Sequence, residues 1–451
     1  MKIALVNPYQ RRLVSRKGKI YNRVWPPLEL ANTGAVLEGQ GHEVRIVDAN
    51  AMALAPEKVA DLVSGFDKVF VSSSSLDRWQ CPCLDIEPFL NAVCQINRVS
   101  DEIYVIGVHG TVKPAEILEL TRAKAVIRGE PEITVAELCE GRPLSEIKGL
   151  AFREAGKVIL TEEQRPVDLN NLPKPAFHLL PMNRYHYEVL GYNFTLFEGS
   201  RGCASKCRFC LLKMYGLGVR RKKLEKLIEE VEYAIASFGI KRAYFMDLEF
   251  TVFRDQVLDL CDYLSRKRYD FCWTCQTRLD LVDEHLLRKM KQAGCRLIHF
   301  GVEAGGDGLL ARVNKKITIR QIEEGMHLVH QADIDSACFF MLGFPNSDAG
   351  EMEETINFAK KLNPTYALFH IATPYPATVL YDQVLQEDSD VFGKAMFPEA
   401  FLQGEDLIKL KKVIRHAYLE FYLRPTYVGS RLLRGDLRSL SGQIKLLLGY
   451  L

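Results

Sequence analysis

Short apolar runs alternate with segments of helical periodicity along most of the chain, in two separate series. Apolar runs of strand length indicate buried strands, and apolar positions that recur every three to four residues indicate helices. The first series predicts strands at residues 2–7, 43–48, 68–73, 102–107 and 125–128, and helices at 28–40, 56–63, 83–97, 114–120 and 132–139. This alternation is typical of a doubly wound parallel sheet, in which ligands bind at the carboxyl ends of the strands.

The second series begins near residue 191 and repeats the same rhythm. It predicts six strands, at residues 193–197, 243–246, 273–276, 297–300, 337–342 and 366–371, and helices at 224–238, 255–265, 284–293, 318–331 and 351–362. Six such strands predict a partial (β/α)6 barrel rather than a complete barrel of eight. Active sites of barrels of this type lie at the carboxyl ends of the strands.

The stretches between and after the two series set the domain boundaries. A predicted hairpin at 149–160 and a proline-rich stretch at 172–177 indicate a connector, because each proline pushes the preceding residue out of the helical region. Beyond residue 385 only helices are predicted, including an amphipathic one at 407–421. We therefore expect an α/β protein with four parts: a Rossmann-like sheet domain at 1–141, a hairpin and linker at 142–190, a partial barrel at 191–385 and a helical region at 386–451.

Composition is that of an ordinary globular protein, with 47% hydrophobic and 26% charged residues among 451. A formal net charge of +2 gives no general electrostatic reason for nucleic-acid binding. The chain opens with a strand instead of a signal peptide, and no apolar run is long enough to span a membrane. Its 12 cysteines are mostly scattered, which favours a reducing cytoplasm over a disulfide scaffold.

Three of these cysteines are closely spaced: Cys203, Cys207 and Cys210 form a C-x₃-C-x₂-C motif directly after the strand predicted at 193–197. Closely spaced thiolates on one loop suit an iron–sulfur cluster. Three ligands for four irons would leave one iron open to a non-protein ligand. The alternatives are a zinc loop or three core cysteines, although zinc would require a fourth Cys or His nearby.

With Phe209 before its last cysteine, the motif resembles the signature of radical S-adenosylmethionine (radical SAM) enzymes. The resemblance implies a 4Fe-4S cluster whose open iron binds S-adenosylmethionine, which is then cleaved to a 5′-deoxyadenosyl radical. It also implies S-adenosylmethionine contacts near the strand ends, at Phe209, Asp247, Glu249, Gln276, Arg278, Gly301, Glu303, Gly343 and Pro374. Carboxylates there would attract the cationic amine and sulfonium, although any one of these acids alone could be a helix cap or a surface residue.

The first series resembles the cobalamin-binding domain that precedes some radical SAM domains. The resemblance implies cobalamin contacts at Pro8, Ser72, Ser73, Ser74, Gly107, His109, Gly110, Thr111, Gly129 and Glu130. The D-x-H-x-x-G motif that supplies a histidine to cobalt is absent, so we expect no cobalt ligand from that loop, and we expect His109 to contact the periphery of the cofactor. The alternative is a nucleotide-type sheet that has lost its cofactor.

Taken together, the resemblances imply a cobalamin-dependent radical SAM methyltransferase that transfers methyl from methylcobalamin to an unactivated carbon. The first alternative is a cyclase or ring-forming enzyme acting on a lipid or tetrapyrrole, because residues 416–425 are similar to those of the anaerobic magnesium-protoporphyrin cyclase and hopanoid-modifying group. The second is a non-catalytic cobalamin or redox sensor. A tRNA methylthiotransferase is disfavoured, since no second set of cluster cysteines and no basic RNA domain is present.

The implied partners are a small-molecule or lipid-like substrate and a one-electron reductant of the flavodoxin or ferredoxin type, and we expect no nucleic acid. No catalytic acid or base is identified. The last 20 or so residues form an apolar stripe flanked by basic residues, which could lie on a membrane surface or pack on the protein itself. We expect a cytoplasmic protein, with peripheral membrane contact if the first option holds.

Overall fold

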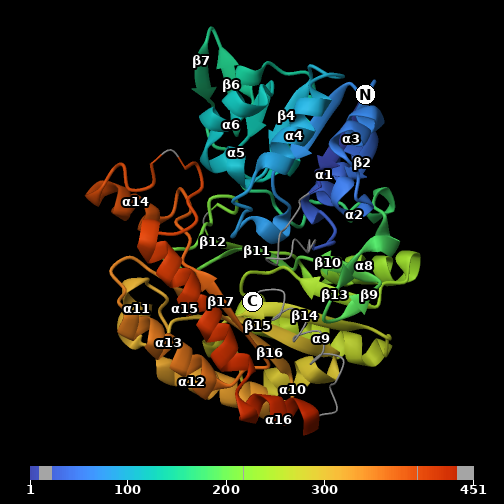
Figure 1. Cartoon of the computed structure of the whole chain (residues 1–451). Helices are drawn as coiled ribbons and strands as arrows, with labels where there is room; N and C mark the ends of the chain where they lie inside the picture. Colours follow the sequence, from blue (N-terminus) through green and yellow to red (C-terminus); the bar gives the residue numbers. More distant parts are fainter. Residues whose placement is uncertain (10–22, 217, 394, 434–451) are drawn as a thin grey trace. The chain divides into compact units, whose positions relative to one another are not determined.

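The computed structural model describes residues 1–9, 23–216, 218–393 and 395–433 (Figure 1). These residues form two compact units. The first contains the described residues of Met1–Arg11, Asn22–Ala204 and Leu211–Met246, and the second those of Ser205–Cys210 and Asp247–Leu451. The predicted α/β class with parallel strands is confirmed, whereas the division into four parts stays a prediction.

The first unit contains a seven-stranded sheet in the order β2-β1-β3-β4-β5-β6-β7. Its strands are β1 (Lys2–Asn7), β2 (Glu43–Asp48), β3 (Lys68–Ser72), β4 (Ile103–Ile106), β5 (Ala125–Ile127), β6 (Leu150–Glu154) and β7 (Lys157–Leu160). The pairs from β2 to β5 are all parallel. All four residues of β4 are buried, as expected for a strand covered on both faces.

Among the described residues, seven helices connect these strands: α1 (Leu28–Gly39), α2 (Ala49–Met52), α3 (Pro56–Val63), α4 (Glu87–Ile96), α5 (Val108–Val112), α6 (Pro114–Thr121) and α7 (Pro131–Cys139). α1 packs against α7, while α3 and α4 lie side by side (Figure 1). The strand order reverses at β1, so right-handed crossovers place helices on both faces of the sheet. The reversal also brings the carboxyl ends of β1 and β3 together, which is where open α/β sheets bind ligands.

The hairpin predicted at 149–160 is present as β6 and β7, and it extends the first sheet because β6 pairs antiparallel with β5. Alternating apolar residues predict a hairpin but do not say which strand it joins. Two helices also differ from expectation. The helix predicted from residue 83 begins at Glu87, and the short helix α5 after Gly107 has no counterpart among the predicted helices.

The remaining elements of the first unit are β8 (His186–Tyr187), β9 (Gly191–Tyr192), β10 (Phe194–Phe197), β11 (Ser200–Cys203), β12 (Gly218–Arg221), α8 (Leu224–Phe238) and β13 (Arg242–Phe245). β10 pairs parallel with β13, and β11 pairs antiparallel with β12. All four residues of β10 are buried, which explains why its apolar run is evident in the sequence.

The second unit contains β14 (Cys272–Thr277), β15 (Cys295–Glu303), β16 (Asp335–Leu342) and β17 (Tyr366–Ile371), paired in chain order and all parallel. Its helices are α9 (Arg254–Lys267), α10 (Glu284–Gln292), α11 (Asp307–Arg312), α12 (Ile319–Gln331), α13 (Ala349–Leu362), α14 (Val379–Glu387), α15 (Gly404–Tyr422) and α16 (Pro425–Leu433). The six strands predicted for the second series are thus all present, as β10, β13 and β14 to β17. Their closure into a partial barrel stays a prediction.

Helix α15 covers the outer edge of β17 with tyrosine hydroxyls. The Tyr422 hydroxyl donates to Ala367 O (3.0 Å) and accepts from Ala367 N (3.1 Å). One helical turn earlier, the Tyr418 hydroxyl accepts from Phe369 N (3.1 Å). These hydroxyls satisfy backbone groups that an exposed edge strand would offer to another chain.

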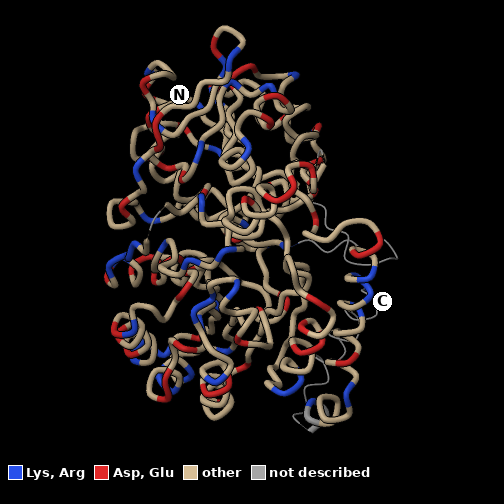
Figure 2. The backbone as a smooth tube through the Cα atoms, turned by 90° about the vertical axis from the view of Figure 1, so that its left-hand side faces the viewer, with Lys and Arg blue, Asp and Glu red and all other residues tan. Residues whose placement is uncertain are grey.

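The described part of the chain contains no helix long and apolar enough to cross a membrane. The predicted amphipathic segment at the C-terminus lies almost entirely outside the described residues, which end with α16. Figure 2 shows Lys and Arg interspersed with Asp and Glu along the backbone of each unit. This mixture agrees with the near-neutral net charge of the sequence.

Candidate functional site

The three cysteines of the predicted metal motif lie at the end of β11 and in the loop after it. Cys203 is the last residue of β11 and faces Gly218 of β12. Cys207 and Cys210 belong to the loop Ser205–Cys210 of the second unit, in which Cys210 N donates to Cys207 O at 3.2 Å. All three thiols are half-buried, so they are sheltered and still able to reach a ligand.

The loop Ser205–Cys210, which we call the cysteine loop, is tethered within the second unit by its backbone. Two tethers go to the segment after α11 and one goes to α14. They join Arg208 N to Val313 O (3.0 Å), Asn314 Nδ2 to Lys206 O (2.6 Å) and Leu380 N to Arg208 O (2.9 Å). The cysteines are therefore carried by a loop whose main chain has defined partners.

A buried ion pair lies near Cys207. Lys315 Nζ is 2.8 Å from Glu303 Oε1, and each side chain is only 9% exposed. Burial acts to lower the pKa of Lys315, but the Glu303 carboxylate and the Cys207 thiol outweigh it and the net pKa is raised, so this lysine stays protonated. Burial raises the pKa of Cys207, and the Lys315 ammonium opposes that shift.

Gly301, two residues before Glu303 on β15, makes room for this pair. A Cβ at this position would lie 2.4 Å from Glu303 Oε1 and 2.8 Å from Lys315 Nζ. Both distances are closer than real contacts allow, so any side chain would displace the ion pair. The glycine predicted to contact S-adenosylmethionine is therefore required by the protein's own packing.

Arg278, just after β14, is surrounded by acceptors from three segments. Its Nε and Nη2 donate to the two carboxylate oxygens of Asp280 at 2.9 and 2.8 Å. Nη1 donates to Lys315 O (2.9 Å) and to the Ser205 hydroxyl (3.3 Å), and Nη2 also donates to Lys316 O (2.9 Å). The same Ser205 hydroxyl donates to Glu249 Oε1 at 2.7 Å.

The other residues predicted to contact S-adenosylmethionine take several positions in the second unit. The Phe209 ring lies 5.7 Å from that of Phe344, and Gly343 (φ +81°) packs against Leu410 of α15. Asp247 is buried, and it adds to the rise in the pKa of the Cys275 thiol that burial chiefly causes. Gln276 is half-buried on β14 and Pro374 is buried after β17. The contacts given above bring Glu249, Arg278, Gly301 and Glu303 together around Ser205 and Lys315, two residues that the sequence analysis did not single out.

The residues predicted to contact cobalamin follow β1, β3, β4 and β5 in the first unit. Pro8 is buried just beyond β1, and Ser72, Ser73 and Ser74 are at most 2% exposed. The Ser74 hydroxyl accepts from Val108 N at 2.9 Å. A Cβ on Gly107 (φ +108°) would lie 2.7 Å from Ser73 Oγ, so this glycine lets the exits of β3 and β4 approach each other.

His109 on α5 is fully buried, and its Nε2 lies 2.8 Å from Cys83 O. Burial lowers the pKa of His109 to about 4, so the ring is neutral near pH 7. Gly110 packs against Val126, and Thr111 Oγ1 accepts from Gly129 N (3.0 Å) and lies 3.0 Å from Met214 Sδ. The small and hydroxyl residues of this edge thus have defined roles in joining α5 to β5.

Glu130 takes part in a buried network centred on Arg201, which sequence analysis did not identify. Arg201 donates to both oxygens of Glu198 (2.8 Å each) and to Glu132 (3.0 Å), and it lies 3.5 Å from Glu130. Glu130 also accepts from Val167 N (2.8 Å) and bonds Arg220 of β12. This carboxylate is therefore engaged by protein groups.

Two buried polar atoms near the exit of β3 have no hydrogen-bond partner within the described residues: Ser73 Oγ and Trp79 Nε1. Trp79 is fully buried. The centre of its ring lies 5.4 Å from that of the Tyr215 ring and 5.5 Å from Cζ of the Arg201 guanidinium. Leaving buried donors and acceptors unsatisfied is costly. They fit a polar ligand at the switch point of the first sheet.

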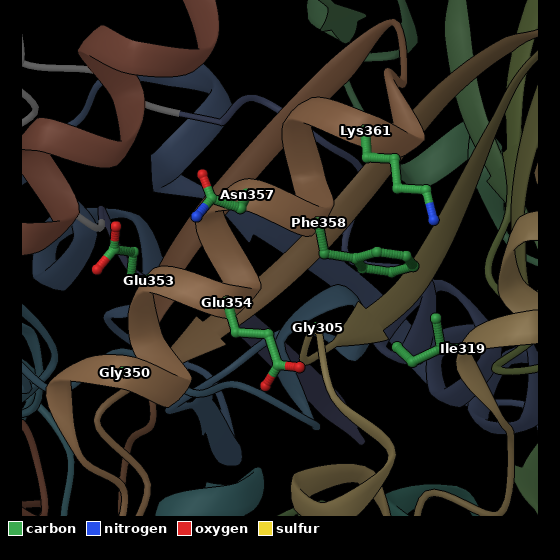
Figure 3. Close-up of a pocket in the computed structure, with 8 residues that line it drawn as sticks. All are labelled: Gly305, Ile319, Gly350, Glu353, Glu354, Asn357, Phe358 and Lys361. Carbon is green, nitrogen blue, oxygen red and sulfur yellow. The ribbon is translucent and has the colours of Figure 1, made fainter.

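A separate cavity of about 530 Å³ lies between α12 and α13 (Figure 3). Glu354 lies near Gly305 there, and Phe358 and Lys361 extend toward Ile319. None of the residues predicted from the sequence lines it. It contains no thiol and is distinct from the site around the cysteine loop.

Comparisons with known proteins concern the family and the fold. A model of the radical SAM superfamily matches residues 197–359. The chain is 30% identical over 443 residues to an uncharacterized methyltransferase of Pyrococcus horikoshii, covering 94% of this chain and 93% of that one. It is 26% identical to the anaerobic magnesium-protoporphyrin IX monomethyl ester cyclase of Rubrivivax gelatinosus, covering 88% of this chain and 74% of that one.

Among solved structures, the chain is similar in fold to TsrM of Kitasatospora setae, a radical S-adenosylmethionine methyltransferase whose structure holds cobalamin and a 4Fe-4S cluster. The TM-score is 0.68 at 18% identity, and the match covers 86% of this chain and 75% of that one. At this identity the likeness concerns the fold.

Proposed function

Because the chain belongs to the radical SAM superfamily, as its match to the Pyrococcus methyltransferase and to the superfamily model establishes, we propose that it is a cobalamin-dependent methyltransferase that acts on an unactivated carbon. The name of that relative supports the reaction type. The fold shared with TsrM, which binds cobalamin and methylates, supports the cofactor. In this proposal, the first sheet is the cobalamin domain and the strands β10 and β13 to β17 belong to a partial radical SAM barrel.

The thiols of Cys203, Cys207 and Cys210 would hold a 4Fe-4S cluster, with its fourth iron left for S-adenosylmethionine. Soft thiolates in this number and spacing fit the cluster. When bound, the cluster and S-adenosylmethionine supply a carbon radical that removes a substrate hydrogen, and cobalamin supplies the methyl group.

The chain's own residues would bind and orient these groups. Buried carboxylates of Asp247, Glu249 and Glu303 would attract the cationic amine and sulfonium of S-adenosylmethionine. Lys315 fixes the Glu303 carboxylate by a 2.8 Å hydrogen bond and so limits the directions from which it can accept another donor. Phe209 and Phe344 would add an apolar wall beside the cysteine loop.

One structural observation supports this proposal above the others. The pKa of the Cys207 thiol responds, after burial, to Lys315, Glu303, Arg278 and Glu249. A proposed cluster ligand and the charged side chains suited to a zwitterionic cofactor therefore lie in one place. A zinc loop would not require these four buried charges.

The cobalamin site would lie at the carboxyl ends of β1 and β3. Ser73 Oγ and Trp79 Nε1 would find there the hydrogen-bond partners that they lack within the described residues. His109 would act in its neutral form at the periphery of the cofactor, since its Nε2 already faces Cys83 O. The contacts predicted at Pro8, Gly110, Thr111 and Gly129 belong to the same proposal.

A cyclase or ring-forming reaction on a lipid or tetrapyrrole is the second candidate, favoured by the similarity to the Rubrivivax cyclase. The stretch at 416–425, which suggested this candidate, contains Tyr418 and Tyr422, which bond the edge of β17. This structural role explains the presence of the two tyrosines without a cyclase reaction. A non-catalytic sensor remains the third reading.

The experiment that separates these candidates is anaerobic incubation of the reconstituted protein with cell extract, cobalamin, a reductant and S-adenosylmethionine labelled in its methyl group. Methylation predicts a product that carries the label, found by mass spectrometry. A cyclase predicts deoxyadenosine and an unlabelled product, and a sensor predicts neither. Titration of the full-length protein with hydroxocobalamin tests the cofactor directly, and absence of binding would contradict the methyltransferase proposal.

The proposed partners are a small-molecule or lipid-like substrate and a flavodoxin- or ferredoxin-type reductant. Contact of the C-terminal segment with a membrane surface also stays a proposal. Co-sedimentation with anionic liposomes, comparing the full chain with one that ends at Leu433, tests it. If the full chain sediments with the liposomes and the shortened chain does not, membrane contact is supported. If neither chain sediments with them, membrane contact is contradicted.

A further inference from the structure

One polar cluster joins the cysteine loop to the rest of the second unit. We propose that Arg278 and Ser205 form a clamp that fixes the cysteine loop in the geometry required by its metal ligands, and that both are positioning residues. The inference rests on the proposed function for the identity of the metal group. The clamp itself is a property of the protein and can be tested without that group.

Arg278 has no N–H left for a cofactor. A guanidinium carries five N–H donors. Each has a protein acceptor: the two oxygens of Asp280, the carbonyls of Lys315 and Lys316, and the hydroxyl of Ser205. We therefore assign to this arginine a role that differs from the direct contact with S-adenosylmethionine implied by the resemblance.

Ser205 links a cation to a carboxylate. Its hydroxyl has one proton, which it donates to Glu249 Oε1 at 2.7 Å, and it accepts from Arg278 Nη1 at 3.3 Å. Arg278 Nε and Glu249 Oε1 are themselves 4.0 Å apart. The hydroxyl thus fixes a residue between Cys203 and Cys207 to two charged side chains at the exits of β13 and β14.

The clamp acts on both sides of the cysteine loop. Through the carbonyls of Lys315 and Lys316, Arg278 also fixes the segment that follows α11. The neighbouring residues Val313 and Asn314 provide two of the backbone tethers of the loop. One guanidinium therefore holds the loop directly at Ser205 and indirectly through the segment to which the loop is bonded.

The clamp can be weakened in small steps in the full-length protein. Ser205→Ala removes the hydroxyl, whereas Ser205→Thr keeps it. Arg278→Lys keeps the charge but loses the planar fork. Arg254 provides the matched control, because it makes a similar bidentate pair with Asp283 (2.7 and 3.1 Å) at the surface of the same unit, and none of its hydrogen bonds given by the structure reaches the cysteine loop.

The first readout uses metal-free protein. Alkylation of Cys207 and Cys210 by iodoacetamide, followed by peptide mass spectrometry, reports how often the loop opens. Loss of a hydrogen bond of this kind should increase the alkylation rate roughly threefold to tenfold in Ser205→Ala and Arg278→Lys. Ser205→Thr and Arg254→Lys should react like the wild type, and a thermal melt shows that each variant is folded.

The second readout uses reconstituted protein, in which iron release to a chelator is followed with time. The clamp predicts faster release from Ser205→Ala and Arg278→Lys, with rescue in Ser205→Thr. Wild-type rates in both assays for Ser205→Ala would overturn the clamp. If the wild type takes up no cluster, the proposed function fails, whereas the alkylation assay still supports or overturns the clamp.

Discussion

Lys315 Nζ and Glu303 Oε1 form an ion pair of 2.8 Å inside the second unit, and only the absence of a side chain at Gly301 leaves room for it. The pair is almost fully withdrawn from water, and neither residue can move without leaving the other buried and charged. This makes it both a structural requirement and a fixed electrostatic feature beside Cys207.

Replacing only the lysine of this pair should be strongly destabilising. Lys315→Met leaves Glu303 buried without its cation, and such losses cost about 3–5 kcal/mol. Urea unfolding followed by circular dichroism measures the effect. The double variant Lys315→Met with Glu303→Gln should recover much of it, because no uncompensated charge remains.

The matched control is the exposed pair of Arg320 and Glu324 on α12, whose side chains are 87% and 59% exposed. Arg320→Ala should unfold at almost the same urea concentration as the wild type. Equal effects of Lys315→Met and Arg320→Ala would show that the buried pair has no special weight.

The Arg201 network should dominate the stability of the first unit. Arg201 is fully buried and bonds Glu198 and Glu132, so Arg201→Lys, which cannot form the planar fork, should lower the melting temperature clearly. Lys148→Ala, which removes an exposed partner of Glu162, should melt like the wild type. If both variants melt alike, the network does not stabilise the unit as proposed.

The buried carboxyl of Glu29 should make the stability of the fold depend on pH. Burial raises the pKa of this carboxyl to about 8 from its ordinary 4.5, although Leu76 N donates to it at 2.8 Å. Between these values the folded state holds a proton that the unfolded chain releases, so the free energy of unfolding falls as the pH rises through this window, by an amount of the order of 5 kcal/mol. The stabilisation that the protonated Glu29 contributes is fully present below pH 4.5 and is lost above about pH 8.

Glu29→Gln should remove this part of the pH dependence, since the amide oxygen can still accept from Leu76 N and carries no charge. Melting temperatures measured from about pH 5 to pH 9 test the expectation. Glu57→Gln, an exposed change on α3, is the control. A pH profile of Glu29→Gln parallel to that of the wild type would contradict the assignment.

The tyrosine hydroxyls on α15 should protect the edge of β17. Tyr418→Phe together with Tyr422→Phe removes the bonds to Ala367 and Phe369 and exposes an edge that can pair with another chain. The double variant should therefore aggregate at lower temperature, as light scattering would show. Tyr381→Phe, where the ring stacks on Phe392, tests removal of a hydroxyl elsewhere, and equal aggregation of both would count against edge protection.

Much of the fold could be predicted because its strands are short, apolar and buried. β10, β4 and the helices between the parallel strands are evident from periodicity. The pairing of β6 with β5 was not, because a hairpin pattern contains no information about its neighbour. The strand β12 was also missed, since its residues Gly218–Arg221 are polar and partly exposed.

The candidate site, too, could be predicted only in part. Cysteine spacing and acids after strands predicted where the chemistry would lie. The sequence could not indicate Lys315, Ser205 or Arg201, because each gains its importance from burial beside residues far away in the chain; Arg201 and Glu132 are 69 positions apart. Ser205 and Arg201 offered one signal, their location beside the predicted cluster cysteines, whereas Lys315 offered none.

The most direct test of the central claim is electron paramagnetic resonance of the anaerobically reconstituted, reduced protein, with iron and sulfide analysis, before and after addition of S-adenosylmethionine. We predict one 4Fe-4S cluster per chain, with a spectrum that changes when S-adenosylmethionine binds to the open iron. The variant with Cys203, Cys207 and Cys210 all changed to Ala should bind no cluster. A cluster retained by that variant, or a wild-type spectrum indifferent to S-adenosylmethionine, would contradict the account.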